Sequence, residues 1–220
     1  SIIRLNRTNN AAIKNVEYPT KGSAEVCKDV LIENQWTKTT QGQTIAFSAL
    51  GYYFARSIVE RTNYTIPVGV IEIGFSGQPL GSFLPNEIAD EFNTDTYNAE
   101  TGVYTTTGSG AAEGSGRYIY NRHLYPLEKY SLAGIVWYQG ESEAIECMAQ
   151  DYFNRFSSFV TNIRNDMLMP DLPIFTVQLH RHTDDFDNGM LMDEHYDLVR
   201  EAQRKAALLI KNVHIIPSID

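Results

Sequence analysis

Short apolar runs alternate along this chain with segments of helical periodicity, and few folds accept that order. The runs are rich in β-branched and aromatic residues, which is typical of buried strands. They are Val68–Ile73, Leu132–Tyr138, Pro173–Leu179 and Val213–Ile216. Because strands and helices that alternate along a chain favour a parallel sheet covered on both faces, we expect an α/β fold.

The predicted helices are defined by apolar residues that recur every three to four positions. One such segment starts near Ala46, has Ser48 as its expected N-cap, and ends near Arg61–Asn63. Residues 144–168 and 194–210 show the same periodicity, and Arg117–Tyr130 predicts a helix interrupted at Pro126. The first 46 residues indicate one short strand followed by a long polar loop.

Residues 93–117 differ from the rest of the chain because threonine and glycine dominate them. A segment so poor in bulky apolar side chains cannot build a core of its own. The whole chain has 220 residues, a length that suits one domain. We therefore expect a single domain over residues 1–220, with a surface loop excursion at about 93–117.

Charge and composition exclude several kinds of partner. The formal net charge is −9, and an acidic surface repels phosphate backbones, so we expect no nucleic-acid partner. The chain has no apolar run of about 18 residues and no signal peptide, so we expect no membrane span. Cys27 and Cys147 fit no metal-ligand spacing, and Asp184–Gly189 fails the calcium-loop pattern. We expect neither a metal nor a cofactor; whether the cysteines pair is left open.

Two loops directly follow predicted strands and contain groups suited to acyl transfer. Gly77 lies in one and Gln139 in the other. In a parallel sheet both loops lie at the same edge, where a glycine N–H and a glutamine amide can form an oxyanion hole. Glu141 is placed to orient a base or a substrate hydroxyl. The alternative is two tight turns whose polar groups bond only to local backbone.

Five segments carry a resemblance that goes beyond periodicity. They are FSALGYYFAR (Phe47–Arg56), PVGVIEIGFSGQPLGSF (Pro67–Phe83), GIVWYQGES (Gly134–Ser142), LPIFTVQL (Leu172–Leu179) and REAQ (Arg200–Gln203). The third is the most specific. In this order, from about Ile2 to Asp220, they resemble the sialate O-acetylesterases, a branch of the SGNH hydrolases.

The resemblance implies a flavodoxin-like three-layer sandwich with a central parallel sheet. It also implies a carbohydrate O-acetylesterase with a Ser nucleophile, a His base and an Asp or Glu support, acting on O-acetylated sialic acid or other glycans without a cofactor. By this resemblance Gly77 and Gln139 are oxyanion donors and Glu141 lies near the triad. Ser76, Ser142 and His180 are candidate substrate contacts, although a hydroxyl bonded to its own loop, or a surface histidine, is the more common role. The family's substrates imply a secreted or periplasmic protein.

Several positions depart from the family's pattern. Ser76 replaces the first glycine of a GG pair, Gly81 replaces a glutamate, and Glu143 stands where asparagine is usual. The nucleophile is expected in a GQSN motif before Ile3, and the histidine in a D-x-H-P motif after Asp220, so we expect the domain to be incomplete at both ends. The alternative function is a non-catalytic relative that binds glycans, or a scaffold fragment. The sugar, the acetyl position and the oligomeric state are left open.

Overall fold

The computed structural model describes residues 3–7, 36–40, 47–74, 77–89, 94–98, 103–107, 119–144, 146–181, 186–187, 190–191 and 195–218. These residues form two compact units, one up to Gly74 and the other from Gly77 onward. Ser76, Cys27 and the side chain of Cys147 lie outside the described residues. The single domain expected over residues 1–220 remains a prediction.

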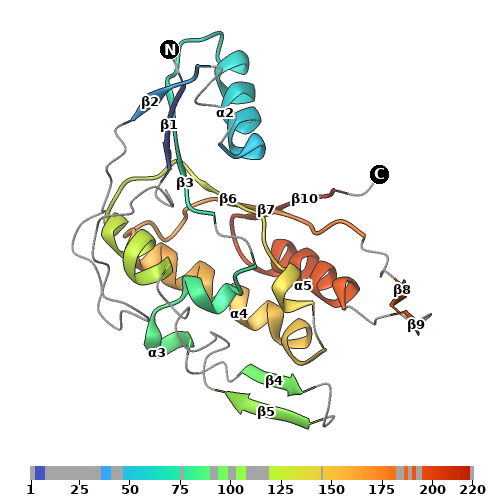
Figure 1. Ribbon diagram of the computed structural model, residues 1–220. Helices are drawn as coiled ribbons and strands as arrows, with labels where there is room; N and C mark the ends of the chain where they lie inside the picture. The colour runs from blue at the N-terminus through green and yellow to red at the C-terminus, as the bar shows by residue number, and fades with distance from the viewer. Residues whose placement is uncertain are drawn as a thin grey trace, which may run out of the picture. The chain divides into compact units, whose positions relative to one another are not determined.

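The first unit combines a three-stranded sheet with one helix (Figure 1). Its strands are β1 (Ile3–Arg7), β2 (Thr37–Lys38) and β3 (Val68–Glu72), and its helix is α2 (Ala49–Arg61). β1 pairs in parallel with β3 and antiparallel with β2. The buried side chains of Ile3 and Leu5 on β1 pack with Ala55 and Val59 on α2, so the apolar stripe of the helix forms the core of this unit.

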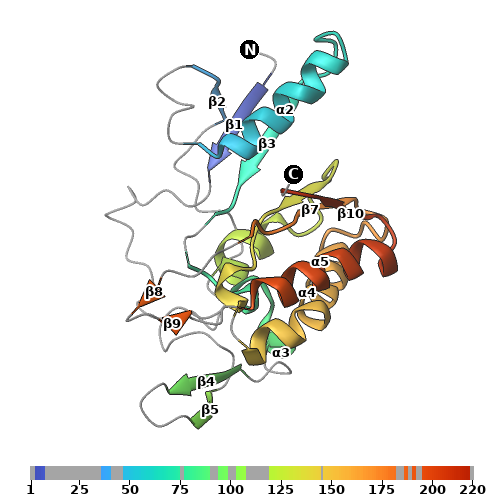
Figure 2. The same ribbon diagram turned by 90° about the vertical axis from the view of Figure 1, so that its right-hand side faces the viewer.

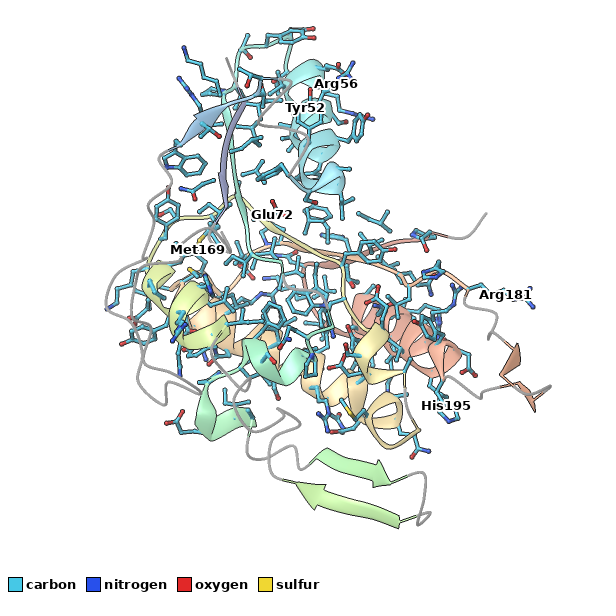
Figure 3. The ribbon with its side chains drawn as sticks, viewed as in Figure 1. Tyr52, Arg56, Glu72, Met169, Arg181 and His195 are labelled. Atoms are coloured by element: carbon cyan, nitrogen blue, oxygen red, sulfur yellow. The ribbon has the colours of Figure 1, made fainter. Side chains whose placement is uncertain are left out.

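The start of α2 is fixed as the sequence predicted. The Ser48 hydroxyl caps the helix by accepting the Gly51 N–H at 3.2 Å. The Ser48 N–H in turn donates to the carboxylate of Glu72 at the end of β3, at 3.3 Å. Figure 3 shows Glu72 at that strand end, and Tyr52 and Arg56 on successive turns of α2. These bonds tie the helix to the strand that follows it.

The second unit contains a parallel sheet in the order β6–β7–β10. The strands are β6 (Ile135–Trp137), β7 (Ile174–Val177) and β10 (Val213–Ile216). Two helices, α4 (Glu146–Asp166) and α5 (Tyr196–Leu209), lie side by side against the sheet (Figures 1 and 2). These bounds confirm the strands and helices predicted after residue 130.

The core of the second unit is built from one aromatic stripe of α4. Tyr152, Phe156 and Phe159 are buried on this stripe, and the Trp137 ring of β6 lies 4.3 Å from the Phe159 ring. At the far end of α4, the Arg164 guanidinium donates to the carbonyl oxygens of Leu172 at 2.9 Å and Lys211 at 2.7 Å. The helix end is thereby tied to the segments that enter β7 and β10.

Shorter elements complete the second unit. They are η1 (Leu80–Phe83), α3 (Asn86–Ala89), β4 (Thr94–Asn98), β5 (Val103–Thr107), the π-helical η2 (Tyr120–Leu124), η3 (Tyr125–Leu127), η4 (Glu141–Glu143), β8 (Phe186–Asp187) and β9 (Met190–Leu191). β4 and β5 pair antiparallel inside the excursion expected at 93–117, so part of that segment is a hairpin and not a loop. Its threonines suit strands, a preference that outweighed the polarity of the segment.

The strands of the two units pair in separate sheets. In the described parts of the chain, β3 pairs with β1, while β6 and β10 both pair in parallel with β7, so each unit has its own three-stranded sheet. The one central parallel sheet stays a prediction, because apolar periodicity identifies a strand but not its partner. The molecule is a mixed α/β protein. No helix in the described ranges is long and apolar enough to cross a lipid bilayer.

Candidate active site

The turn that leaves β6 can be formed only by glycine at its centre. Gly140 has φ +145°, a backbone conformation that side chains rarely allow. A Cβ added there would lie 2.8 Å from Cγ1 of Val199 on α5 and 3.1 Å from Cδ1 of Leu179. The turn is therefore pressed against α5 and against the segment that leaves β7. This close packing fixes the position of Gln139, the residue just before it.

Both hydrogens of the Gln139 side-chain amide are engaged. One is donated to the carbonyl oxygen of Gln78 at 3.2 Å, and the other to the carboxylate of Glu143. The backbone carbonyl oxygen of Gln139 accepts the Tyr152 hydroxyl and the Gln203 amide, each at 3.1 Å. Burial raises the pKa of Tyr152, so its hydroxyl stays a donor. Gln139 is thus held at both its side chain and its backbone.

Glu143 is the only acidic side chain recorded as fully buried among the described residues. Its carboxylate accepts the Leu80 N–H with one oxygen and the Gln139 amide with the other. Burial raises the pKa of Glu143 to about 7, although the two N–H donors and the nearby Arg155 act to lower it. Glu143 therefore joins the turn after β6 to η1, which begins at Leu80.

A second set of bonds joins α5 to the end of β7. The Gln203 amide oxygen accepts the Leu179 N–H at 2.9 Å, and the Arg200 guanidinium donates to the Leu179 carbonyl oxygen at 2.6 Å. Arg200 and Gln203, three residues apart on α5, thus tie this helix to the end of β7. Because Gln203 bonds to both Gln139 and Leu179, the carboxyl ends of β6 and β7 share one buried amide.

The other residues predicted for the site differ in exposure and lie on different segments. Gly77 is exposed, has φ +67°, and directly precedes Gln78, so its loop is joined to Gln139. Glu141 is exposed and Ser142 half-buried on η4, the turn that also contains Glu143. The exposed His180 ring lies 5.9 Å from the ring of Tyr196, the first residue of α5. Ser76 lies outside the described residues.

Figure 3 shows what surrounds this region of the second unit. Arg181 lies at the end of the segment that leaves β7, and His195 lies just before α5. The His195 N–H donates to the carbonyl oxygen of Ala144 at 2.9 Å, so the start of α5 is tied to the end of the η4 turn. At the other end of the sheet, the Met169 sulfur accepts the Leu132 N–H at 3.4 Å, before β6 begins.

Sequence reasoning missed two residues of this network. Glu143 was noted only as a departure from a family pattern, because charged residues are ordinarily solvated. Tyr152 lies within the helix predicted at 144–168, where apolar periodicity gives no separate signal for a buried hydroxyl. The described residues hold no group of three or more His, Cys, Asp or Glu side chains placed to bind a metal ion.

The buried carboxylate leads to a prediction about pH. Between pH 4.5, the usual pKa, and about 7, folded Glu143 keeps a proton that the unfolded chain has released. The contribution of Glu143 to stability should therefore fall as pH rises through this window, by about 3 kcal/mol at most. Urea unfolding from pH 4.5 to 8 should show this fall in the wild type and lose it in Glu143→Gln. The control is Glu87→Gln, at an exposed position on α3; an unchanged pH dependence in Glu143→Gln would contradict the assignment.

The ends of β6 and β7 are held together by the buried amide of Gln203, and the turn after β6 also contains the buried carboxylate of Glu143. The carboxyl edge of a parallel sheet is where α/β enzymes commonly bind their ligands. Residues 31–220 match the model of the carbohydrate esterase, sialic acid-specific acetylesterase family. The chain belongs to this family of carbohydrate esterases.

Known proteins agree with this assignment. Human sialate O-acetylesterase is 26% identical over 144 residues, which make up 61% of this chain and 26% of that protein. A probable carbohydrate esterase of Arabidopsis thaliana is 28% identical over 108 residues, 45% of this chain and 41% of that protein. The chain thus spans about a quarter of the human relative's length. A carbohydrate acetylesterase from Xanthomonas citri has a similar fold, with a TM-score of 0.69 at 21% identity over 98% of this chain and 42% of that one.

Proposed function

We propose that this protein is a carbohydrate O-acetylesterase that removes acetyl groups from sialic acid or another O-acetylated glycan. The observation that carries the proposal is the network around Gln139, which joins the Gly77 loop to the turn after β6 in a chain of this family. Membership in an esterase family favours this reading over a glycan-binding protein without activity.

The proposed chemistry is an acyl-enzyme mechanism of the serine type. A Ser hydroxyl attacks the acetyl carbonyl carbon while a His takes the proton, and the tetrahedral intermediate then releases the sugar hydroxyl with that proton. Water attacks the acetyl-enzyme in the second half and acetate leaves. The resemblance assigns the Ser to a GQSN motif on the amino-terminal side of Ile3 and the His to a D-x-H-P motif on the carboxyl-terminal side of Asp220. No metal and no cofactor enters this scheme.

In this proposal Gly77 and Gln139 bind the oxyanion of the intermediate. The Gly77 N–H lies in an exposed loop. The carbonyl oxygen of Gln78, the following residue, accepts a hydrogen bond from the Gln139 amide. The hydrogen bond from the Gln139 amide to the Gln78 carbonyl oxygen is long, at 3.2 Å, and therefore weak. A negatively charged oxyanion can displace the Gln78 carbonyl oxygen and accept a shorter, charge-assisted hydrogen bond from the same amide. Glu141 orients the His or a sugar hydroxyl, while Ser76, Ser142 and His180 are proposed to contact the sugar.

The proposal extends to the fold of the complete domain and to its place of action. We infer that the complete domain has the flavodoxin-like three-layer fold that the resemblance to SGNH hydrolases implies. Because the family's substrates are glycans, we propose that the protein acts as a secreted or periplasmic enzyme. O-acetylated carbohydrate is the one partner that the proposal needs.

Comparing two lengths of the protein tests where the nucleophile lies. Residues 1–220 alone should hydrolyse p-nitrophenyl acetate slowly, because an oxyanion site without its triad leaves only a residual rate, roughly 10³-fold over water. The full-length protein should be fast on this ester and should release acetate from O-acetylated sialic acid or another acetylated sugar. Circular dichroism should show that both forms are folded. Equal rates for the two lengths would place the nucleophile within residues 1–220 and would contradict the scheme.

A further inference from the structure

The buried carboxylate of Glu143 has no role in the chemistry described so far. It lies on η4, two residues after the exposed Glu141, and its side chain is fully buried. A buried carboxylate is costly unless donors surround it, and the two recorded here come from different segments: the backbone of Leu80 and the side chain of Gln139. These are the segments that carry the two proposed oxyanion donors.

We propose that Glu143 is a positioning residue for the oxyanion site, an inference that rests on the proposed function. By accepting one hydrogen of the Gln139 amide, the carboxylate fixes the plane of that amide and directs the second hydrogen at the Gly77–Gln78 loop. By accepting the Leu80 N–H, it fixes the end of the same loop. One side chain thus sets the relative position of both donors.

A carboxylate suits this position better than an amide because both of its oxygens can accept hydrogen bonds. Both partners of Glu143 are N–H donors, so both of its oxygens must accept. Glutamine at this position would offer one oxygen and one NH₂ group. The Gln139 amide would then relieve the donor–donor clash by rotating through about 180°, which puts its oxygen in the place of its nitrogen. An oxyanion would meet an acceptor there instead of a donor.

Neighbouring groups affect the ionisation of Glu143 and the position of its partner Gln139. Burial is the largest influence on Glu143 and raises its pKa, and the exposed Glu141 acts in the same direction; the two N–H donors and the buried Arg155 guanidinium, which pairs with Asp151 at 3.3 Å, act to lower it. Tyr152 holds the backbone of Gln139 from the α4 side. The Tyr152 hydroxyl also lies 3.4 Å from the side-chain oxygen of Gln139, so Glu143 fixes the nitrogen side of the amide and Tyr152 contacts its oxygen side, while Tyr152 and Gln203 hold the backbone carbonyl oxygen.

A double-mutant cycle in the full-length protein tests the inference. The variants are Glu143→Gln, Gln139→Ala and the two combined, with Glu201→Gln on the exposed face of α5 as the control. If Glu143 acts through Gln139, Glu143→Gln should lower kcat about tenfold or more with KM nearly unchanged. In the Gln139→Ala background the same change should lower kcat by at most about threefold, since the group it positions is gone.

The outcomes separate the inference from the function on which it rests. Equal losses of kcat in both backgrounds would mean that Glu143 only supports the fold, and would overturn the inference. A wild type without acetylesterase activity, or an undiminished Gln139→Ala, would overturn the proposed function and the inference with it.

If Glu143→Gln does not fold, NMR of the wild type can test the inference instead. The side-chain NH₂ signals of Gln139, identified by their loss in Gln139→Ala, should be protected from exchange and should shift with pH as Glu143 titrates. Rapid exchange of both hydrogens, with no such titration, would overturn the inference.

Discussion

Replacing Gly140 with alanine should lower the free energy of unfolding by about 2–5 kcal/mol. The positive φ of +145° is a conformation that costs a side-chain-bearing residue about 1–3 kcal/mol, and a methyl group 2.8 Å from Val199 Cγ1 adds an overpacking cost of similar size. A domain with total stability of roughly 5–15 kcal/mol would be left marginal. Urea unfolding followed by fluorescence should show the lower midpoint.

Gly77→Ala is the matched control for this prediction. Gly77 also has a positive φ, of +67°, but a Cβ there meets no atom within 4 Å. Only the backbone cost of about 1–2 kcal/mol remains, so the midpoint should move less than in Gly140→Ala. If the two variants lost the same stability, the contact of Gly140 with Val199 and Leu179 would not be the reason for the glycine.

Gln139→Ala should lower kcat for acetate release by the full-length protein about 10²–10³-fold. Loss of one preformed oxyanion donor has that effect because the donor acts mainly on the transition state, so KM should change little. Gln150→Ala, at an exposed position of α4, is the matched control and should keep wild-type kcat. A loss of less than about threefold in Gln139→Ala would remove Gln139 from the proposed chemistry.

The secondary structure could be predicted from the sequence wherever buried apolar residues recur at the spacing of a helix or form a short continuous run. The strand predicted at Val213–Ile216 has those bounds in the structure, and α5, predicted at 194–210, extends from Tyr196 to Leu209. The Ser48 cap was predictable because a serine just before an apolar helical run commonly accepts a hydrogen bond from a free N–H of the first helical turn. Strand partners were not predictable in this way, since the pairing of β3 with β1 leaves no mark in either strand's periodicity.

The sequence predicted that the loops of Gly77 and Gln139 lie close together, but not which hydrogen bonds hold them. The Gln139 amide donates to the carbonyl oxygen of Gln78, the residue after Gly77, so the two loops are joined. That the two loops lie at one edge of one parallel sheet stays a prediction, because β3 and β6 pair in different sheets. The burial of Glu143 could not be foreseen, because its two recorded partners are a backbone N–H 63 residues away and an amide four residues away.

The most direct test of the oxyanion site is a crystal structure of the full-length protein with a phosphonate ester bound to its nucleophile. The tetrahedral phosphorus places one oxygen where the oxyanion forms. We expect that oxygen to accept bonds of about 2.7–3.1 Å from the Gly77 N–H and from the Gln139 amide, which will have left the Gln78 carbonyl oxygen. A phosphonate oxygen bound by other donors, with the Gln139 amide still on Gln78, would contradict the proposed site.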